Sequence, residues 1–379
     1  MKNLLKYVAA TSCALVPVLV AAQPIKVAQI VELSGPGTPA GSMYRNGVKM
    51  ALAEINAAGG VLGRKVEATE MDTQTQPAIA KAMTVKAIDD GVVTIFGPVF
   101  SGSILVSQGE SQKAGIPNFT GGEAASVSAQ GNPYLFRSAF NQAMSMPKIA
   151  KYMATDMKLK TVAVVFINND FGKGGRDAII KELTARGVKV TGDISTDPGQ
   201  IDFSAPVLRA KQANADALFA YLTEEESARL LKELRKQGYD RPIVGETTIM
   251  GAKVVELAGN AANGVKGHVG LTADAPNPLI KVFGDKFEKE FKARADHNAI
   301  KGYFSAYAMK ASIEKAGKVD PKAMAAALRN SCFTAKQYPG MLLDVCFDEK
   351  GDIDRESYLV EVKNGKQEVI AVLPALGKK

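Results

Sequence analysis

The stretch IKVAQIVELSGPGTPAG, residues 25–41, joins an apolar, β-branched run to a loop rich in glycine and proline. Residues 41–58 then change to helical spacing, with an apolar stripe formed by Val48, Leu52 and Ile55. Two glycines follow and end the predicted helix. This succession predicts a strand, a loop and a helix, which is the unit of parallel α/β sheets.

The glycine-rich loop does not match a dinucleotide-binding turn. Gly35, Gly37 and Gly41 have one residue too many between the second and third glycines for that fingerprint. Pro36 and Pro39 also remove backbone amides that would otherwise bind a phosphate. We therefore expect no nucleotide and no other cofactor.

The alternation of short apolar strands and helices continues along the chain and starts afresh after about residue 140. TVAVVFI at 161–167 is typical of a buried strand, helices dominate from 277 to 330, and a hairpin is expected to turn at Asn364-Gly365. Short strands separated by helices indicate parallel sheets with helices on both faces. The sequence thus predicts an α/β protein of two doubly wound lobes, with a ligand site in the cleft between them.

The first 22 residues are typical of a secretory signal peptide. Lys2 and Lys6 precede an apolar run that ends in small residues, so we expect cleavage after Ala22. Loss of the two lysines would lower the formal net charge from +8 to about +6. The mature protein is therefore expected to be exported and soluble.

Charge, cysteines and histidines argue against several classes of function. The basic residues are scattered among acids and form no stripe, so we expect no nucleic-acid partner. Beyond the leader, Cys332 and Cys346 remain, and an even pair in an exported chain predicts a disulfide, with two buried free thiols as the alternative. His268 and His297 show no ligand spacing with these cysteines, so we expect no metal site.

Two features that could indicate an enzyme have simpler explanations. The Asp-Phe-Gly triplet at 170–172 lacks the other kinase signatures, and Asn169 or Asp170 can cap a helix there. No Gly-x-Ser-x-Gly elbow occurs, and neither histidine lies near a candidate serine in the sequence. We therefore expect a protein that is not an enzyme.

From residue 33, LSGPGTPAGSMYRNGVKMALAEINAAGGVLGRKVE resembles the start of the leucine/isoleucine/valine-binding family of periplasmic substrate-binding proteins. The resemblance continues in the same order through AIDDGVVTIFGPVFSG, GNPYLFRSAF, VAVVFINNDFGKG and FDEKGD, and covers nearly the whole chain after the leader. It implies a type I periplasmic binding protein, in which three crossovers join the lobes. Lobe one would comprise residues 23–140 and 273–357, and lobe two residues 141–272 and 358–379.

The resemblance also implies a function. Such proteins are soluble receptors of ABC importers, and they bind a ligand by hinge closure before delivering it to a permease in the inner membrane. We accordingly expect a periplasmic monomer that binds a small amino acid-like ligand, organic acid or amide. A sensor of the same fold that signals to a membrane receptor is the alternative.

Matching positions give the expected ligand contacts. Ser101 matches the serine that binds a ligand carboxylate at a helix N-terminus, and Phe171 matches an aromatic residue of the cleft. Glu246 matches an acid that would pair with a ligand ammonium, with Thr247 taking its place if the alignment slips by one residue. The other expected contacts are Ala40, Thr120, Gly121, Gly122, Glu123, Thr223 and Glu224.

Some of these residues have a purely structural alternative. Ser101 could cap a helix, Phe171 could belong to the core of lobe two, and Glu246 could be a charge on a surface loop. The acidic run 224–226 could complement the dipole of the helix that it opens.

Two departures from the family pattern concern the ligand. Ala40 stands where the family often has an aromatic residue of the cleft wall. Glu123 places an acid where a bound carboxylate would be repelled. A plain branched-chain amino acid is therefore not assumed, and larger amino acids, amides and aromatic acids remain open as ligands.

Overall fold

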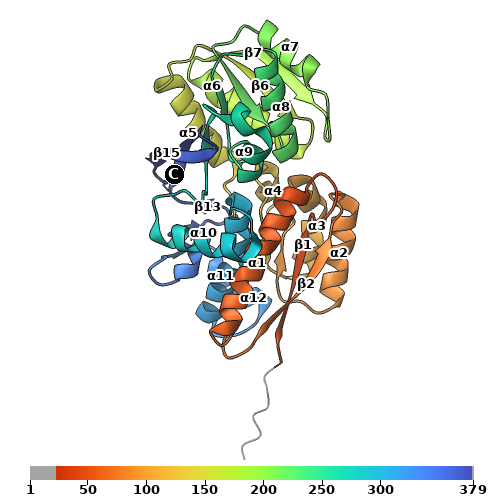
Figure 1. Ribbon diagram of the computed structural model, residues 1–379. Helices are drawn as coiled ribbons and strands as arrows, with labels where there is room; N and C mark the ends of the chain where they lie inside the picture. Colours follow the sequence, from red (N-terminus) through yellow and green to blue (C-terminus); the bar gives the residue numbers. More distant parts are fainter. Residues whose placement is uncertain (1–22, 378–379) are drawn as a thin grey trace, which may run out of the picture.

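Two sheets organise the chain into two stacked lobes (Figure 1). The computed structural model describes residues 23–377, so the expected signal peptide at 1–22 lies outside the described residues. We call the lobe of the five-stranded sheet lobe one and the lobe of the seven-stranded sheet lobe two. The prediction of an α/β protein with two lobes is confirmed.

The sheet of lobe one is entirely parallel, with the strand order β2-β1-β3-β4-β5. Its strands are β1 (Ile25–Val31), β2 (Val66–Asp72), β3 (Ile95–Phe96), β4 (Asn118–Thr120) and β5 (Leu135–Arg137). The connecting helices are α1 (Thr38–Ala57), α2 (Pro77–Asp89), α3 (Ser101–Ala114) and α4 (Ala125–Ala129). Helix α2 begins at Pro77 because a proline suits the first helical turn, and α3 begins at Ser101 because the chain at Phe100 is still extended.

The sheet of lobe two has the order β15-β14-β10-β9-β8-β6-β7 and is parallel except for its last two strands in sequence. Its strands are β6 (Thr161–Ile167), β7 (Lys189–Thr196), β8 (Ala217–Tyr221), β9 (Ile243–Gly245), β10 (Lys266–Val269), β14 (Ser357–Lys363) and β15 (Lys366–Leu373). The associated helices are α5 (Gln142–Thr155), α6 (Asp170–Ala185), α7 (Ser204–Gln212), α8 (Glu224–Lys236) and α9 (Ala252–Ala258). The predicted hairpin is confirmed, since β14 and β15 pair around Asn364 and Gly365, which both have positive φ.

The segment between the two lobe-two portions returns to lobe one. It contains α10 (Pro278–Phe291), α11 (His297–Ala316) and α12 (Pro321–Leu328), and then a small sheet of β11 (Ser331–Phe333), β12 (Val345–Phe347) and β13 (Ile353–Asp354). Cys332 and Cys346 are paired residues of β11 and β12, and a disulfide joins them. The chain therefore passes between the lobes three times, while the exact boundaries at 140, 272 and 357 stay predictions.

Helix α11 packs closely against α1, as the two neighbouring labels in Figure 1 indicate. Glycines permit this close approach: a Cβ at Gly47 would collide with the carbonyl oxygen of Ala299, and one at Gly302 with that of Tyr44. Tyr44 also reaches across the contact, because its hydroxyl lies 2.9 Å from Ser305 Oγ and 3.0 Å from the carbonyl oxygen of Phe119. This packing fixes the first turns of α11 beside the ends of the lobe-one strands.

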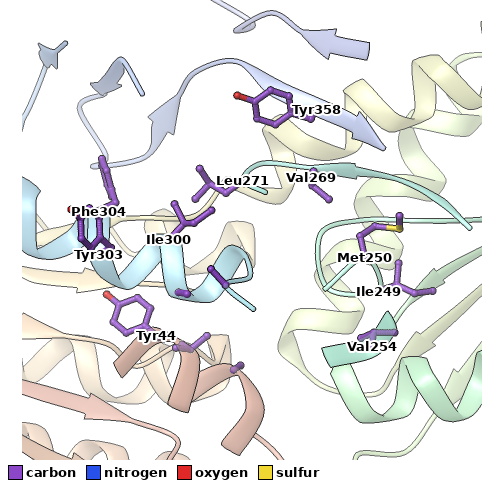
Figure 2. Close-up of a cluster of buried hydrophobic side chains, with 14 of the residues drawn as sticks. Tyr44, Ile249, Met250, Val254, Val269, Leu271, Ile300, Tyr303, Phe304 and Tyr358 are labelled. Carbon is purple, nitrogen blue, oxygen red and sulfur yellow. The ribbon is translucent and has the colours of Figure 1, made fainter. Parts of the chain in front are cut away.

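The largest apolar core includes residues of both lobes. Figure 2 shows part of it, with Tyr44 of α1 on one side of α11, Ile300 and Phe304 of α11 on the other, and Met250 and Val269 on the lobe-two side. Burial of such side chains is the main favourable term in folding. None of the helices formed by residues 23–377 combines the length and apolar character that a membrane span requires.

Candidate functional site

A cavity of about 330 Å³ lies between the lobes, at the carboxyl ends of strands from both sheets. Lobe one contributes the residues that follow β1, β2, β3 and β4, and the beginning of α11. Lobe two contributes residues that follow β6, β7, β8 and β9. The cavity thus occupies the position where open parallel sheets bind ligands.

The loop that opens the chain forms one edge of this cavity. Asp72, at the end of β2, accepts hydrogen bonds from the backbone amides of Leu33 and Ser34 at 2.9 and 3.1 Å. Thr75 accepts a hydrogen bond from the amide of Gly37 at 3.0 Å. These bonds hold the loop so that Ala40, in the first turn of α1, lines the cavity. The loop that contains these glycines and prolines therefore forms an edge of the cleft between the lobes.

The N-terminus of α3 faces the cavity and provides a place for an anionic group. Ser101 is the first residue of α3, Phe100 is its N-cap, and both line the cavity. Glu32 holds the preceding turn, because its carboxylate accepts the amides of Val99 and Phe100 at 3.1 Å each. The first amides of a helix lack partners within the helix, and the helix dipole favours an anion there. The alternative in which Ser101 is the N-cap is wrong.

An aromatic pair forms part of the opposite wall. Phe171 lines the cavity from the first turn of α6 and stacks on Tyr221 with ring centroids 4.2 Å apart. Asn169 is the N-cap of α6 and accepts the amide of Gly172 at 2.9 Å, which confirms the capping expectation. Phe171 is only partly buried against the core, so its ring is available to a ligand as well. Pro36, Pro77 and Val99 add apolar surface from lobe one.

A buried ion pair lies at the base of the cavity. Lys301 Nζ donates to Glu123 Oε1 at 2.8 Å and to the carbonyl oxygen of Gly121 at 3.3 Å. Both charged side chains are largely inaccessible to solvent, and both line the cavity. The hydroxyl of Tyr221 donates to Glu123 Oε2 at 3.2 Å, so the acid of lobe one also contacts lobe two.

A second acid approaches from lobe two. Glu224, the first residue of α8, lines the cavity and accepts a hydrogen bond from Asn298 Nδ2 of α11 at 3.2 Å. The bond joins the lobes across the cleft. Glu226, in the first turn of α8, also lines the cavity, and it accepts the hydroxyl of Thr223 and the amide of Gly199.

Burial changes the titration of these acids. It raises the pKa of Glu123 to about 7. The charge of Lys301 opposes this rise, and the charge of Glu246 adds to it. Burial also raises the pKa of Glu224 to about 7 and that of Asp296, the N-cap of α11, to about 6. The cavity therefore contains acids that change their protonation near neutral pH.

The structure brings together most, but not all, of the expected contact residues. On the cavity lie Ala40, Ser101, Gly121, Glu123, Phe171, Thr223 and Glu224. Thr120 instead donates to the carbonyl oxygen of Pro98 at 2.9 Å, and the carbonyl of Gly122 accepts from Arg137. Glu246 is buried behind the cavity wall, where Oε1 lies 2.9 Å from His268 Nδ1 and accepts from Thr247 Oγ1 at 2.6 Å. The alternative in which Glu246 is a charge on a surface loop is therefore wrong, and its pairing with a ligand ammonium stays a prediction.

The sequence did not indicate Asn298, Lys301 or Thr248, which also line the cavity. Lys301 follows Ala299 and Ile300 and precedes several aromatic residues, so an isolated lysine within an apolar helix was the available signal. Lysine is almost never fully buried unless it is paired. Within residues 23–377, His, Cys, Asp and Glu side chains form no group of three that could hold a metal ion.

Comparison with known proteins agrees with this architecture. A profile of the family described as periplasmic binding protein matches residues 24–367. The leucine-, isoleucine-, valine-, threonine- and alanine-binding protein of Pseudomonas aeruginosa is 28% identical over 341 residues, which cover 90% of each chain.

Solved structures share the fold. A leucine binding protein from Thermotoga maritima superposes with a TM-score of 0.83 at 24% identity, covering 92% of this chain and 99% of its own. An ABC-transporter solute binding protein from R. palustris, in complex with benzoate, gives a TM-score of 0.86 at 21% identity, covering 94% and 98%. The family match extends over nearly all of the described residues. The chain belongs to the periplasmic binding protein family, a family of solute-binding proteins that are not enzymes.

Proposed function

We propose that this protein is the receptor of an ABC importer and binds a small carboxylate with an apolar or aromatic body. The observation that carries the proposal is the cavity itself, which combines the α3 N-terminus with an apolar wall. A carboxylate fits a helix N-terminus because unpaired amides and the helix dipole both favour an anion. A volume of about 330 Å³ suits a small solute.

The named ligands of similar proteins have the same chemistry. The Pseudomonas aeruginosa relative is named for five amino acids, and similar folds were solved with isoleucine, benzoate and 3,4-dihydroxybenzoic acid. Each of these ligands carries a carboxyl group. We propose that the ligand site is lined by Ala40, Ser101, Gly121, Glu123, Phe171, Thr223 and Glu224.

The proposal includes the route and the partner of the protein. Residues 1–22 would direct export and be removed, leaving a periplasmic monomer that delivers its ligand to a permease of the inner membrane. Closure would occur between lobe one (23–140 and 273–357) and lobe two (141–272 and 358–379), at the segments that join them. Asn298 to Glu224 and Tyr221 to Glu123 are direct contacts across the cleft and would stabilise the closed form.

A thermal-shift screen of the mature protein tests the ligand class. The panel contains leucine, isoleucine, phenylalanine, 4-methylpentanoate, benzoate and 3,4-dihydroxybenzoate. A ligand at one hundred times its Kd should stabilise the protein by about 2.7 kcal/mol. Hits are then measured by isothermal titration calorimetry to obtain Kd.

A cavity-filling variant provides the control for this screen. Ala40→Phe places a ring in the cavity and should change which acids of the panel stabilise the protein and by how much, whereas Val282→Phe, on an exposed position of α10, should leave every shift intact. A screen in which no carboxylate stabilises the wild type would refute the proposed ligand class. Equal shifts for wild type and Ala40→Phe would place the binding site elsewhere.

A further inference from the structure

One basic side chain stands out at the cavity. Among the residues of the described chain that line it, Lys301 is the only lysine or arginine. Its side chain is only 4% exposed, on a helix whose neighbouring turns are packed in the core. An ammonium group at such a position is costly unless it is paired and hydrogen-bonded. Surface solubility therefore does not explain why a lysine occupies this position.

The ammonium of Lys301 is only partly satisfied by the protein. It has three N–H donors, and within residues 23–377 it has two acceptors, Glu123 Oε1 at 2.8 Å and the carbonyl oxygen of Gly121 at 3.3 Å. Because Lys301 lines the cavity, the third donor is available to a ligand. The helix contact at Gly47 and Gly302 fixes the backbone from which this side chain extends.

Lys301 and the α3 N-terminus lie on the two sides of one loop. Lys301 binds the carbonyl of Gly121, while Ser101 Oγ accepts the amide of Ala124 at 3.2 Å. A Cβ at Gly122 would lie 3.3 Å from the same Ser101 oxygen. The two anion-attracting features of lobe one therefore converge on a single corner of the cavity.

We propose that Lys301 binds the carboxylate of the ligand, and that Glu123 is a positioning residue that holds the Lys301 ammonium at this corner. The inference rests on the proposed function and adds the residue that recognises the acid group. It also accounts for an acid at position 123, because Lys301 compensates the charge that would otherwise repel a ligand carboxylate. Charge-assisted bonds of this kind are stronger than neutral ones.

The test compares Lys301→Met with Glu123→Gln at pH 8. Glu123 is mostly ionised at this pH because its pKa is about 7. Calorimetry measures the Kd of each acid in the panel that binds the wild type, together with its amide, for example benzoate with benzamide or leucine with leucinamide. We expect Lys301→Met to weaken the acid at least tenfold and the amide less than threefold. Glu123→Gln should strengthen the acid severalfold, because its amide oxygen still accepts from Lys301 while the competing negative charge is gone.

The opposite signs separate binding from a merely structural ion pair. If the pair only stabilises the fold, both variants should weaken binding in the same direction. Equal losses in the two variants, or binding of the acid to Lys301→Met within twofold of wild type, would overturn the proposal. If no acid binds the wild type, the proposed ligand class fails first, so the two failures can be told apart.

Two further variants control for a loss of binding that is caused by misfolding. Lys148→Met removes another buried lysine, whose Nζ donates to Ser357 Oγ at 2.9 Å away from the cavity, and it should leave the Kd unchanged. The double variant Glu123→Gln/Lys301→Met leaves neither charge unpaired and should fold, but it should still lose the preference for acid over amide. Retention of that preference in the folded double variant would also refute the role of Lys301.

Discussion

Two buried ion pairs hold the same loop of lobe one, and they differ in whether they line the cavity. Arg137 is fully buried, and its guanidinium binds Asp352, the carbonyl oxygens of Gly122 and Ala124, and Ser128 Oγ. Asp352 also accepts from Ser128 Oγ and Asn141 Nδ2, both at 2.8 Å. In the Lys301–Glu123 pair on the cavity, one of the three ammonium N–H donors has no acceptor among residues 23–377.

The difference indicates two roles for buried charge in one molecule. A pair away from the cavity, such as Arg137–Asp352, fixes the geometry of a loop but does not meet a ligand there. A pair with a remaining donor on a cavity can bind one, at a lower contribution to stability. The Arg137 network thus sets the shape of the 121–124 loop, on which the ligand-facing Lys301 depends.

The largest expected effect is on stability and concerns the Arg137–Asp352 pair. Arg137→Met should lower the free energy of unfolding by about 3–5 kcal/mol, because it leaves Asp352 buried without its charged partner. Lys301→Met should cost less, about 1–3 kcal/mol, because Glu123 can take up a proton near neutral pH. Urea denaturation of both variants at pH 7 measures the difference. Equal losses would show that the two pairs are energetically alike.

A smaller effect concerns pH. The folded pKa of Glu123, about 7, lies above its ordinary value of 4.5, so the folded state binds the proton more tightly than the unfolded state. The resulting stabilisation is complete below about pH 4.5 and is lost as pH rises through 7. Wild type should therefore lose stability relative to Glu123→Gln between pH 5 and 8, by up to about 1.4 kcal/mol per pH unit.

The comparison with Glu123→Gln is needed because other groups titrate nearby. Glu123 faces Lys301 of α11, Tyr221 of β8 and Glu246 after β9, and the pKa values of Glu224 and Asp296 are raised as well. These groups remain in both proteins, so the difference isolates Glu123. Urea denaturation at pH 5, 6, 7 and 8 gives the two curves, and parallel curves would contradict the prediction.

The smallest effect is expected behind the cavity wall. Burial raises the pKa of Glu246, and Gln has the shape of a protonated glutamate. Glu246→Gln should therefore change the Kd of an acid ligand less than threefold in calorimetry. A loss of about 2–5 kcal/mol in amino-acid binding would instead support the ammonium-pairing role that the resemblance implies.

Local sequence signals account for much of the fold. Pro77 at a helix start and Asn364-Gly365 at a turn specify their elements because their own backbone preferences decide the local conformation. The loops that follow strands were also predictable as the place of the site, because the carboxyl ends of parallel strands meet at one edge. The small disulfide-linked sheet at 331–354 was not predicted, since its strands have only two or three residues each.

The sequence by itself determined the two-lobed α/β architecture, the family resemblance and the loops that line the cleft, because these follow from short-range patterns. Only the tertiary structure decided which side chains meet there. Lys301 and Glu123 are 178 residues apart, and they pair because α11 packs on α1 through Gly47 and Gly302. Glu246 lies behind the cavity wall, with His268 as a neighbour. Such contacts depend on how helices and sheets pack, which residue spacing along the chain does not specify.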